Sequence, residues 1–234
     1  MPRLLVVGRG RMGILVESLA ADYGFEVAGI VKSGNSARTI AEGAFGAADV
    51  AVDFTVAEAV PGNLPPLAAR GINVVIGTTG WLAHEPAMRA VATEAGIGVV
   101  AAPNFSLGMN VFQLVVEEAA RRFAPHPDFG AWLHETHHDR KKDAPSGTAL
   151  ALKAGMEHAG FPRAIDVSST RVGFTPGTHT VGFDGPSETI ELTHTVRDRA
   201  VFARGALVAA RWVIGRRGWF GMRDVLESGM EGMP

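Results

Sequence analysis

The sequence predicts an α/β protein with a Rossmann-type doubly wound parallel sheet, followed by a second domain of α+β type with an open mixed sheet. Two observations carry this prediction. Short aliphatic runs alternate with helix-compatible segments over residues 1–104, as in a parallel sheet covered on both faces. After Phe105 this alternation stops, and a long stretch rich in Thr, Val, Ile and Phe follows without crossover helices of its own.

The elements of the first domain are read from aliphatic runs bounded by glycine and proline. Each expected strand is a short run of apolar residues, which suits a strand that is buried on both faces. The segment 57–71 (AEAVPGNLPPLAARG) is helical in character, but we expect its prolines to break the helix. The expected strands are 4–7, 25–31, 49–54, 72–80 and 97–105, with a helix after the first strand and another over 85–95.

The second domain is expected to mix helices with strands. Residues 131–138 (AWLHETHH) alternate between two faces, with Leu133, Glu135 and His137 together on one of them. We expect a helix over 107–123, a helix beginning at Ser146, strands between 165 and 202, and helix again from about Ala206.

Composition argues against several classes of function. The formal net charge of −2 gives no basis for binding nucleic acid or an anionic membrane. The chain has no cysteine, so disulfides, a thiolate nucleophile and a cysteine zinc site are excluded. The apolar run before Gly8 is too short for a signal peptide, and no window is long enough to cross a membrane. We therefore expect a cytoplasmic protein with no nucleic-acid or membrane partner.

The turn after the first expected strand predicts dinucleotide binding. Gly8, Gly10 and Gly13 form G-x-G-x-x-G directly after a strand and directly before a helix. The first glycine permits a tight turn, the second lets the backbone approach a pyrophosphate, and the third lets helix and strand pack closely. Without this context the match would indicate no more than an ordinary glycine turn.

The end of the second expected strand bears on the choice of cofactor. An acid usually stands there when the ligand is NAD, but this chain has Lys32 and no carboxylate. Lys32 suits a 2′-phosphate, or is simply a solvated loop cation. We expect NADPH and NADH both to be accepted, with NADPH modestly preferred. The loops 77–80 (GTTG) and 102–105 (APNF) end strands at the same edge and either line the nicotinamide site or are ordinary turns.

The stretch 135–150 (ETHHDRKKDAPSGTAL) crowds two adjacent histidines among cations and aspartates, in a chain with only 8 histidines. A helix that starts at Ser146, beside His137 and Lys141, can hold a carboxylate at its N–H groups. A histidine close to that carboxylate can donate a proton near neutral pH. A solvated surface loop is the plain alternative.

A metal site is a further alternative for this stretch, because several of its side chains are possible ligands. These side chains alternate between faces and share no one-sided spacing such as H-E-x-x-H, so no metal is expected. The possible ligands are His134, His137, His138, Asp139 and Asp143.

The motif E-x-H-H-x-x-K-x-D-A-P-S-G-T-A, present without a gap as residues 135–149, resembles the signature of the 4-hydroxy-tetrahydrodipicolinate (dihydrodipicolinate) reductases. Further segments resemble landmarks of that family in the same order, so the resemblance covers nearly the whole chain. The GRGRMG turn departs from the glycine-richer form of some members, which bears only on its geometry. The other landmarks are DFT at 53–55, GTTG at 77–80, APNFSLGMN at 102–110, GTHTV at 177–181, LTH at 192–194, FARGA at 202–206 and MRDVL at 222–226.

The resemblance implies an NAD(P)H-dependent oxidoreductase of lysine and diaminopimelate biosynthesis. A hydride would pass to a cyclic imine dicarboxylate, giving tetrahydrodipicolinate with loss of water. His137 and Lys141 would be the catalytic acids, with the one that delivers the proton left open, and His138, Ser146, Gly147 and Thr148 would bind the substrate. The cofactor-binding residues would be Gly8, Arg9, Gly10, Arg11, Met12, Gly13, Lys32, Gly77, Thr78, Thr79, Ala102, Pro103, Asn104 and Phe105.

The resemblance also implies the domain organisation. Residues 1–104 and 207–234 would form the dinucleotide-binding domain. Residues 105–206 would form a substrate-binding and oligomerisation domain whose open sheet builds a homotetramer. Closure of the two domains would bring nicotinamide to the His137 loop.

Two other functions compete with the reductase. Another two-domain Rossmann dehydrogenase, such as an aspartate dehydrogenase, would share the glycine turn but has no reason to carry HHDRKKDAPSGT. A nucleotide-sensing module that has lost catalysis would be expected to have replaced His137 or Lys141, and both are present.

Overall fold

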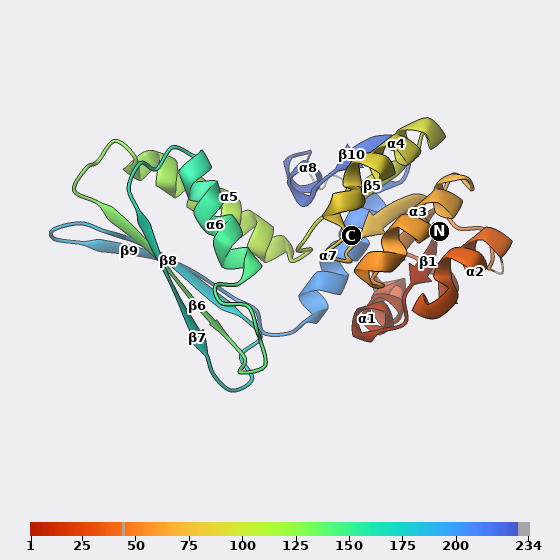
Figure 1. The fold of residues 1–234 in the computed structure, drawn as a ribbon, viewed down its shortest axis with the longest axis horizontal. Coiled ribbons are helices and arrows are strands. Elements are labelled where there is room, and N and C mark those ends of the chain that lie inside the picture. Colours follow the sequence, from red (N-terminus) through yellow and green to blue (C-terminus); the bar gives the residue numbers. More distant parts are fainter. Residues whose placement is uncertain (44, 229–234) are drawn as a thin grey trace. The chain divides into compact units, whose positions relative to one another are not determined.

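The computed structural model describes residues 1–43 and 45–228, which form two compact units (Figure 1). The first unit comprises Met1–Leu107 and the chain from Ala200 onward, and the second is Gly108–Arg199. The return to the first unit therefore comes earlier than the expected residue 207, because one continuous helix begins at Ala200 and buries Ala203 and Ala206 in the core of that unit. The end of the expected C-terminal segment, beyond Ser228, lies outside the described residues.

The first unit contains a six-stranded sheet in the order β10-β5-β4-β3-β1-β2, in which every neighbouring pair is parallel. The chain runs from β1 to β2 at one edge and then crosses to β3 on the other side of β1. The direction of winding therefore reverses between β1 and β3, and ligands of such sheets bind outside the carboxyl ends of the strands at that point. The strands are β1 (Arg3–Val7), β2 (Glu26–Val31), β3 (Val50–Asp53), β4 (Asn73–Ile76), β5 (Gly98–Ala101) and β10 (Gly218–Phe220).

Helices cover both faces of this sheet, so the predicted doubly wound fold is confirmed. Leu4 and Val6 of β1 belong to one core, and Leu5 and Val7 belong to the other, as the alternation of side chains along a strand requires. The first core is closed by α1 (Arg11–Leu19), α7 (Ala200–Val213) and α8 (Met222–Glu227), and the second by α2 (Ser36–Glu42), α3 (Val60–Ala68) and α4 (Glu85–Ala95). Short 3-10 helices are η1 (Ala21–Tyr23), η2 (Ser33–Asn35), η3 (Ala57–Ala59) and η4 (Leu82–His84).

Two features of the first unit differ from the sequence expectations. Helix α3 continues through Pro65 and Pro66, which were expected to break it, because Leu64 and Leu67 are buried in the core and hold the turn in place. Strand β10 lies in a segment that was read as helix-compatible. It adds a parallel edge strand beside β5, and its three residues are too few to show any periodicity.

The second unit contains a mixed four-stranded sheet in the order β7-β6-β8-β9, which confirms the predicted open mixed sheet. β6 and β7 are parallel and are joined through helix α6, whereas β8 pairs antiparallel with β6 and β9. The last strand ends at Thr195 and α7 begins at Ala200, so the strand-rich stretch does not extend to 202. The elements are α5 (Leu107–Phe123), β6 (Gly130–His137), α6 (Gly147–His158), β7 (Ile165–Arg171), β8 (Thr178–Asp184) and β9 (Thr189–Thr195).

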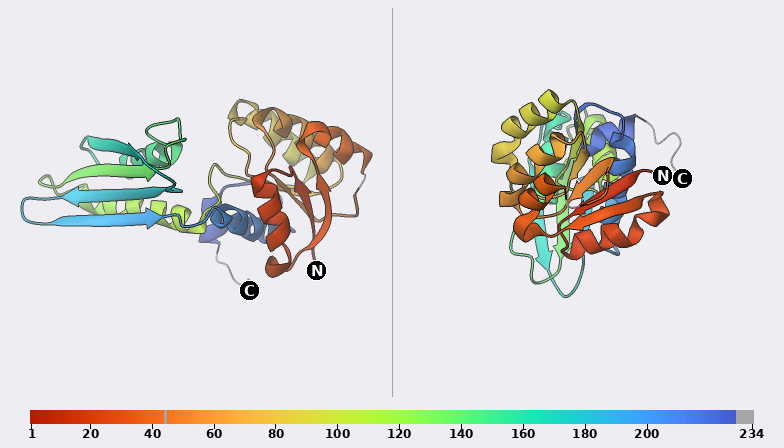
Figure 2. Two further views of the ribbon diagram at one scale, coloured as in Figure 1. Left: turned by 90° about the horizontal axis from the view of Figure 1, so that it is seen from below. Right: turned by 90° about the vertical axis from the view of Figure 1, so that its right-hand side faces the viewer.

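One face of this second sheet is covered and the other is open (Figures 1 and 2). Helices α5 and α6 pack against Leu133, Val181 and Phe183 and form the core of the unit with them. The alternate residues of β6, such as Trp132 and His134, face away from that core and are only partly buried. No helix among the described residues is long and apolar enough to cross a membrane.

Candidate active site

The cofactor-binding residues expected from the sequence all lie at the carboxyl ends of strands in the first sheet. The turn after β1 carries Gly8, Arg9 and Gly10, and the first turn of α1 carries Arg11, Met12 and Gly13. Lys32 directly follows β2. The loop after β4 carries Gly77, Thr78 and Thr79, and the loop after β5 carries Ala102, Pro103, Asn104 and Phe105. Parallel strands bring these segments, distant in sequence, to one edge of the sheet.

The glycines of the first turn fit a bound dinucleotide. A Cβ on Gly13 would overlap the carbonyl oxygen of Gly8, and a Cβ on Gly8 would overlap the carbonyl oxygen of Phe54 after β3, so both positions require glycine. Gly8 also has a φ of +95°, which other residues rarely adopt. Gly10, by contrast, has nothing within 4 Å of its would-be Cβ. This is the glycine at which a pyrophosphate needs close access to the backbone.

Helix α1 offers an N-terminus to this open space. Gly10 is its N-cap and supplies no side-chain hydrogen bond, and no acidic residue lies in the first turn. The first N–H groups of the helix are therefore available to an anion, and the positive end of the helix dipole favours one. Arg9 and Arg11 are exposed on either side of Gly10. Lys32 is also exposed.

Asp53 ties the ends of β3 and β4 together, a role that sequence reasoning did not assign. One carboxylate oxygen accepts hydrogen bonds from Thr55 N (2.9 Å), Thr55 Oγ1 (2.6 Å) and Thr78 Oγ1 (3.1 Å), and the other accepts one from Asn63 Nδ2 (2.8 Å). Burial raises the pKa of Asp53, although these hydrogen bonds oppose the rise. The only signal in the sequence was the DFT landmark at the end of a strand.

A cavity of about 300 Å³ opens beside the loops after β4 and β5. Its walls include Thr78, Thr79, Ala102 and Pro103, which were expected to contact cofactor, together with aromatic residues of β10. Trp219 on β10 packs against Trp81, with ring centroids 6.0 Å apart. This wall could not be expected from the sequence, because β10 itself was missed.

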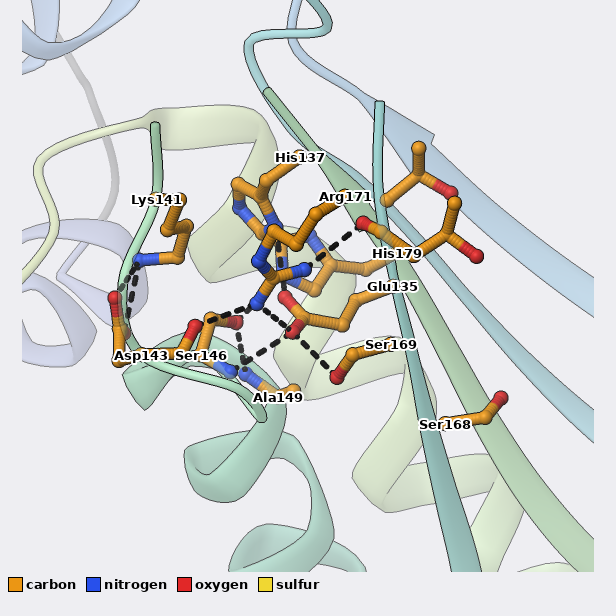
Figure 3. A network of polar contacts seen from close by, with 12 residues as sticks. Glu135, His137, Lys141, Asp143, Ser146, Ala149, Ser168, Ser169, Arg171 and His179 are labelled. Atoms are coloured by element: carbon orange, nitrogen blue, oxygen red, sulfur yellow. Dashed lines mark hydrogen bonds and ion pairs between the residues drawn. The ribbon is translucent and has the colours of Figure 1, made fainter. Parts of the chain in front are cut away.

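The second candidate region lies where β6 ends and α6 begins (Figure 3). Strand register explains how its side chains meet: Glu135 of β6 is opposite Ser169 of β7 and His179 of β8, and His137 is opposite Arg171. Glu135 and His137 are on the buried face of β6, as the alternation in sequence predicted.

Glu135 is the centre of this cluster. Its side chain is 0% exposed, and its Oε1 accepts hydrogen bonds from Ser146 N (2.9 Å), Ser169 Oγ (2.8 Å) and Arg171 Nη2 (2.6 Å). Burial alone would raise the pKa of Glu135, but these donors outweigh burial and lower it to about 2. Glu135 is therefore a carboxylate at any physiological pH.

Two histidines face the other oxygen of this carboxylate. His137 Nδ1 lies 2.7 Å from Glu135 Oε2, and His179 Nε2 lies 3.8 Å from the same oxygen. The close approach to His137 is off-axis, since neither atom has a well-aligned hydrogen-bond partner among the described residues. Burial lowers the pKa of His137, with Glu135 opposing and Lys141 and Arg171 reinforcing the effect. Burial also lowers the pKa of His179, to about 4, so this imidazole is neutral.

Lys141 is held at the edge of the cluster by an ion pair. Its Nζ lies 2.8 Å from Oδ1 and 2.9 Å from Oδ2 of Asp143, and the lysine side chain is 23% exposed. The Lys141 ammonium holds the pKa of Asp143 below its ordinary range. His138 directly follows β6 and is partly buried.

The start of α6 is built as the sequence predicted. Ser146 is the N-cap, and its Oγ accepts a hydrogen bond from Ala149 N (3.2 Å). Gly147 is exposed and Thr148 partly so, and neither the first turn of the helix nor its cap carries an acid. The carboxylate of Asp143 accepts a hydrogen bond from the Gly147 N–H, so this helix start already binds one carboxylate of the chain itself. Because Ser146 N also binds Glu135, this helix start is fixed relative to His137.

The cluster has some features of a metal site. The ligand-type atoms of Glu135, His137 and His179 lie within 4.8 Å of one another. However, the 2.7 Å separation of Oε2 and Nδ1 is shorter than the separation of about 3.3–3.6 Å that two ligands have around one tetrahedral ion with bonds of about 2.0–2.2 Å. The guanidinium of Arg171 also neutralises the only carboxylate of the three. We therefore read the cluster as a charged hydrogen-bonding network. The other possible ligands considered from the sequence, His134, His138, Asp139 and Asp143, do not join it.

Arg171 and His179 were missed as site residues, and Glu135 was seen only as part of a motif. Arg171 and Glu135 are 36 positions apart, and their contact depends on a strand register that the sequence does not reveal. A usable signal was present for Glu135, because an acid stood among the apolar positions of an alternating strand, two residues before a histidine.

A dinucleotide-binding sheet in one unit and a buried acid–base cluster beside a helix N-terminus in the other define a class, the two-domain nicotinamide-dependent oxidoreductases. Within that class, two family models match nearly the whole chain. The model described as "Dihydrodipicolinate reductase, N-terminus" matches residues 2–105, and the model described as "Dihydrodipicolinate reductase, C-terminus" matches residues 108–226. The chain belongs to the dihydrodipicolinate reductase family. The resemblance carried by residues 135–149 is thereby confirmed.

Curated relatives agree with this assignment. The 4-hydroxy-tetrahydrodipicolinate reductase of Methanoculleus marisnigri is 40% identical over 193 residues, which cover 76% of this chain and 75% of that protein. The enzyme of the same name from Thiobacillus denitrificans is 38% identical, covering 96% of this chain and 98% of that protein. Among solved structures, dipicolinate-bound dihydrodipicolinate reductase from Paenisporosarcina sp. TG-14 has the same fold, with a TM-score of 0.78 at 20% identity over 94% of this chain and 97% of that one.

Proposed function

We propose that this chain reduces 4-hydroxy-tetrahydrodipicolinate to tetrahydrodipicolinate with a nicotinamide cofactor, in the pathway to diaminopimelate and lysine. The observation that carries the proposal is the helix start at Ser146, fixed beside His137 and Lys141, in a chain whose relatives of that name align over most of its length. This arrangement provides a carboxylate site and a proton donor side by side, as the reduction of a cyclic imine dicarboxylate requires.

The first unit would hold the cofactor. The open space at Gly10, the uncapped start of α1 and the exposed cations Arg9 and Arg11 support pyrophosphate binding there. When bound, the reduced nicotinamide supplies the hydride. We propose that Gly8, Met12, Gly13, Gly77, Thr78, Thr79, Ala102, Pro103, Asn104 and Phe105 shape the rest of the cofactor site.

Lys32 would set a modest preference for NADPH. It is exposed after β2, where a ribose 2′-phosphate would lie in this fold. An exposed lysine attracts such a phosphate by roughly 1 kcal/mol, screened by salt. We propose that both NADPH and NADH are used.

The second unit would hold the substrate. Gly147 and Thr148 would offer backbone N–H groups, and Thr148 a hydroxyl, to one substrate carboxylate, which would displace the Asp143 carboxylate from the Gly147 N–H. Ser146 would fix the helix start, and His138 would contact the ring. Hydride addition to a carbon of the conjugated ring moves an electron pair to a neighbouring carbon and leaves an enamine. That carbon then takes a proton from His137, assisted by Lys141, whose positive charge also stabilises the developing negative charge. Loss of water from the hydroxylated precursor comes before these steps, because it forms the conjugated double bond that accepts the hydride.

The open face of the second sheet supports a homotetramer. Its uncovered strands carry partly buried residues such as Trp132 and exposed threonines of β9, which a second copy of the chain would cover. Sedimentation analysis of the purified protein tests this assembly.

The decisive test of the function is an absorbance assay at the nicotinamide band. The substrate is made in situ by the synthase that precedes this step, and NADPH and NADH are compared at equal concentration. We expect oxidation of both cofactors only when the synthase and its substrates are present. Oxidation that requires a different imine, such as that of oxaloacetate with ammonia, would instead favour an aspartate dehydrogenase.

A further inference from the structure

The carboxylate of Glu135 divides its two oxygens between different tasks. Oε1 receives three donors, from Ser146, Ser169 and Arg171, and cannot turn away without losing all of them. Among the residues that the structure describes, Oε2 has no such donor, and it faces the imidazoles of His137 and His179. The donors at Oε1 therefore set the orientation of the carboxylate, and the negative charge at Oε2 acts on the two histidines.

The imidazole of His137 has its two nitrogens in different surroundings. Its Nδ1 is turned toward Glu135, at 2.7 Å from Oε2. Its Nε2 is turned toward Gly177, where an added Cβ would lie 3.0 Å from that nitrogen. The backbone of Gly177 therefore lies close to Nε2, and any side chain at this position would press on that nitrogen. The inner nitrogen faces an anion, and the outer nitrogen faces away from it.

A buried anion beside Nδ1 selects one neutral form of the imidazole. A proton on Nδ1 is attracted to the carboxylate, whereas a lone pair on Nδ1 would be repelled by it, so the neutral ring keeps its proton on Nδ1. When the ring is protonated, the second proton is on Nε2. This second proton is the one that can leave toward a substrate.

We propose that Glu135 is a positioning residue for the reaction: held by Arg171 and the N–H of Ser146, it fixes His137 with the proton on Nδ1, so that Nε2 is the atom that delivers the proton to the substrate. This inference deepens the proposed function and rests on it. It settles which nitrogen of His137 reacts. Because one oxygen of Glu135 binds the start of α6 and the other orients His137, the same carboxylate also sets the distance between the acid and the carboxylate site.

The proton balance is complete without any further group. Hydride addition leaves the enamine as its anion, with the negative charge shared between the ring nitrogen and the ring carbon. The imidazolium gives the Nε2 proton to that carbon, the electron pair of the carbon–carbon double bond forms the new C–H bond, and the carbon–nitrogen double bond of the imine is restored. The imidazole is left neutral with its proton still on Nδ1, and water restores the Nε2 proton. Glu135 does not take the proton itself, because its hydrogen bonds lower its pKa to about 2.

The direct test is nitrogen NMR of the full chain labelled with ¹⁵N-histidine, titrated with pH in the absence of substrate. The signals of His137 are assigned by their loss in His137→Gln. We expect neutral wild-type His137 to carry its proton on Nδ1. A neutral ring protonated on Nε2 in the wild-type protein would overturn the proposal, and this measurement needs no variant of Glu135 to fold.

Glu135→Gln then reverses the signal. The amide oxygen of the glutamine is expected to stay with Arg171 and Ser146, which are donors, so its NH₂ group faces His137 and donates to Nδ1. Neutral His137 should therefore carry its proton on Nε2, because Nδ1 must offer its lone pair to this NH₂ group. The wild-type tautomer persisting in this variant would contradict the inference.

Kinetics supply an independent readout. We expect Glu135→Gln to lower kcat by between about tenfold and about 10⁴-fold, within the range seen when the partner of a catalytic histidine is lost, with little change in the KM for the cofactor. The pKa of His137 should fall further, since Glu135 raises it, so the loss of activity with rising pH should begin at lower pH. Lys141, Arg171, Asp143 and His179 also face His137, and all are retained in this variant.

Glu157→Gln is the matched control. It removes one carboxylate from α6 at a site where the side chain is 53% exposed and pairs with Lys153 at 3.9 Å. We expect wild-type activity and an unchanged His137 signal. If the wild-type protein failed to reduce the substrate, the proposed function would fall while the NMR result stood. If it were active and Glu135→Gln kept both its tautomer and its pH profile, only the positioning role would fall.

Discussion

Each unit of this protein has a carboxylate buried at or near the carboxyl end of a strand, and the pKa values of the two carboxylates are shifted in opposite directions. Asp53 after β3 is surrounded by hydroxyl, amide and backbone donors, and burial raises its pKa. Glu135 in β6 has similar donors and, in addition, the guanidinium of Arg171, and its pKa falls to about 2. At Glu135 the donors, Ser146 first and the Arg171 cation after it, together outweigh burial, whereas at Asp53 burial outweighs the donors.

The difference matches what each carboxylate does. Asp53 holds loops together through Thr55, Asn63 and Thr78, which are neutral groups, and this task does not depend on a full charge. Glu135 faces a histidine that would have to carry a proton, and only a stable anion can orient it. A hydrogen-bonded carboxylate holds loops together in one unit, and in the other a charge-paired carboxylate has the position that the proposed mechanism requires.

The largest effect on activity is expected from replacing His137 or Lys141, the two proposed catalytic residues. His137→Gln, and Lys141→Ala beside it, should each lower kcat by about 10²–10⁴-fold while changing KM far less, because an acid acts in the transition state. Steady-state rates with saturating cofactor measure this. Near-wild-type kcat in both variants would show that the proton comes from elsewhere.

Removing the Arg171 cation tests the difference between the two buried carboxylates. Arg171→Met leaves Glu135 buried without its cation, and we expect a loss of about 3–5 kcal/mol in the free energy of unfolding. Asp53→Asn should lose only about 1 kcal/mol, because Asn63 can rotate its amide and present its unpaired Oδ1 to the new NH₂ group. Urea denaturation measures both. Equal losses would mean that the charge pair contributes nothing beyond hydrogen bonding.

Acid should destabilise the second unit through Glu135. The folded pKa of about 2 lies below the ordinary value of 4.5, so the stabilisation is fully present above pH 4.5 and is lost as the pH falls from 4.5 through about 2. The total is about 3 kcal/mol, since one pKa unit corresponds to about 1.4 kcal/mol. Amide exchange of β6 as a function of pH measures it. Glu135→Gln should remove this dependence, and its persistence there would assign it to other groups.

A smaller effect is expected at the start of α6. Thr148→Val keeps the shape of the side chain and removes a hydroxyl donor, which should raise the KM for substrate by roughly three- to tenfold, or about 1 kcal/mol. Inhibition by pyridine-2,6-dicarboxylate should weaken in parallel. Unchanged inhibition would indicate that the substrate carboxylates bind elsewhere. Leu150→Ala, at an exposed position of the same helix, is the control.

The smallest expected effect is on the choice between NADPH and NADH in the first unit. The wild-type protein should favour NADPH by no more than about tenfold, which is about 1.4 kcal/mol, and added salt should narrow the gap. Lys32→Glu should reverse the preference, because it repels the 2′-phosphate and can accept hydrogen bonds from ribose. Titration calorimetry with both cofactors at low salt measures the ratio. An unchanged ratio in Lys32→Glu would assign the selectivity to other groups, such as Arg38.

Local patterns predicted much of the fold. The helices at 85–95 and 107–123, the cap at Ser146 and the two faces of β6 depend on neighbours within a few positions, and the structure confirms each of them. Features that depend on distant partners were not visible. β10 is a strand only because β5 offers it an edge, and α7 begins at Ala200 because the core of the first unit receives it.

The same division holds for the site. A turn such as 8–13 encodes its geometry in its own glycines, whereas the contact of Arg171 with Glu135 exists only once β6 and β7 are in register. The resemblance in residues 135–149 drew attention to His137 and Lys141. It gave no role to Arg171, whose guanidinium is one of the donors that keep Glu135 ionised beside His137.

The first unit is assembled from two stretches of chain that are separated by the whole of the second, and this has a consequence during synthesis. The chain leaves the ribosome from its N-terminus, so strands β1 to β5 emerge well before α7, which must cover Val52, Val75 and Val100 on one face of their sheet. The second unit, whose elements are contiguous, can fold in the interval. A newly made chain therefore carries an uncovered aliphatic sheet face until its last segment emerges, and this is the stage at which chaperones would be needed.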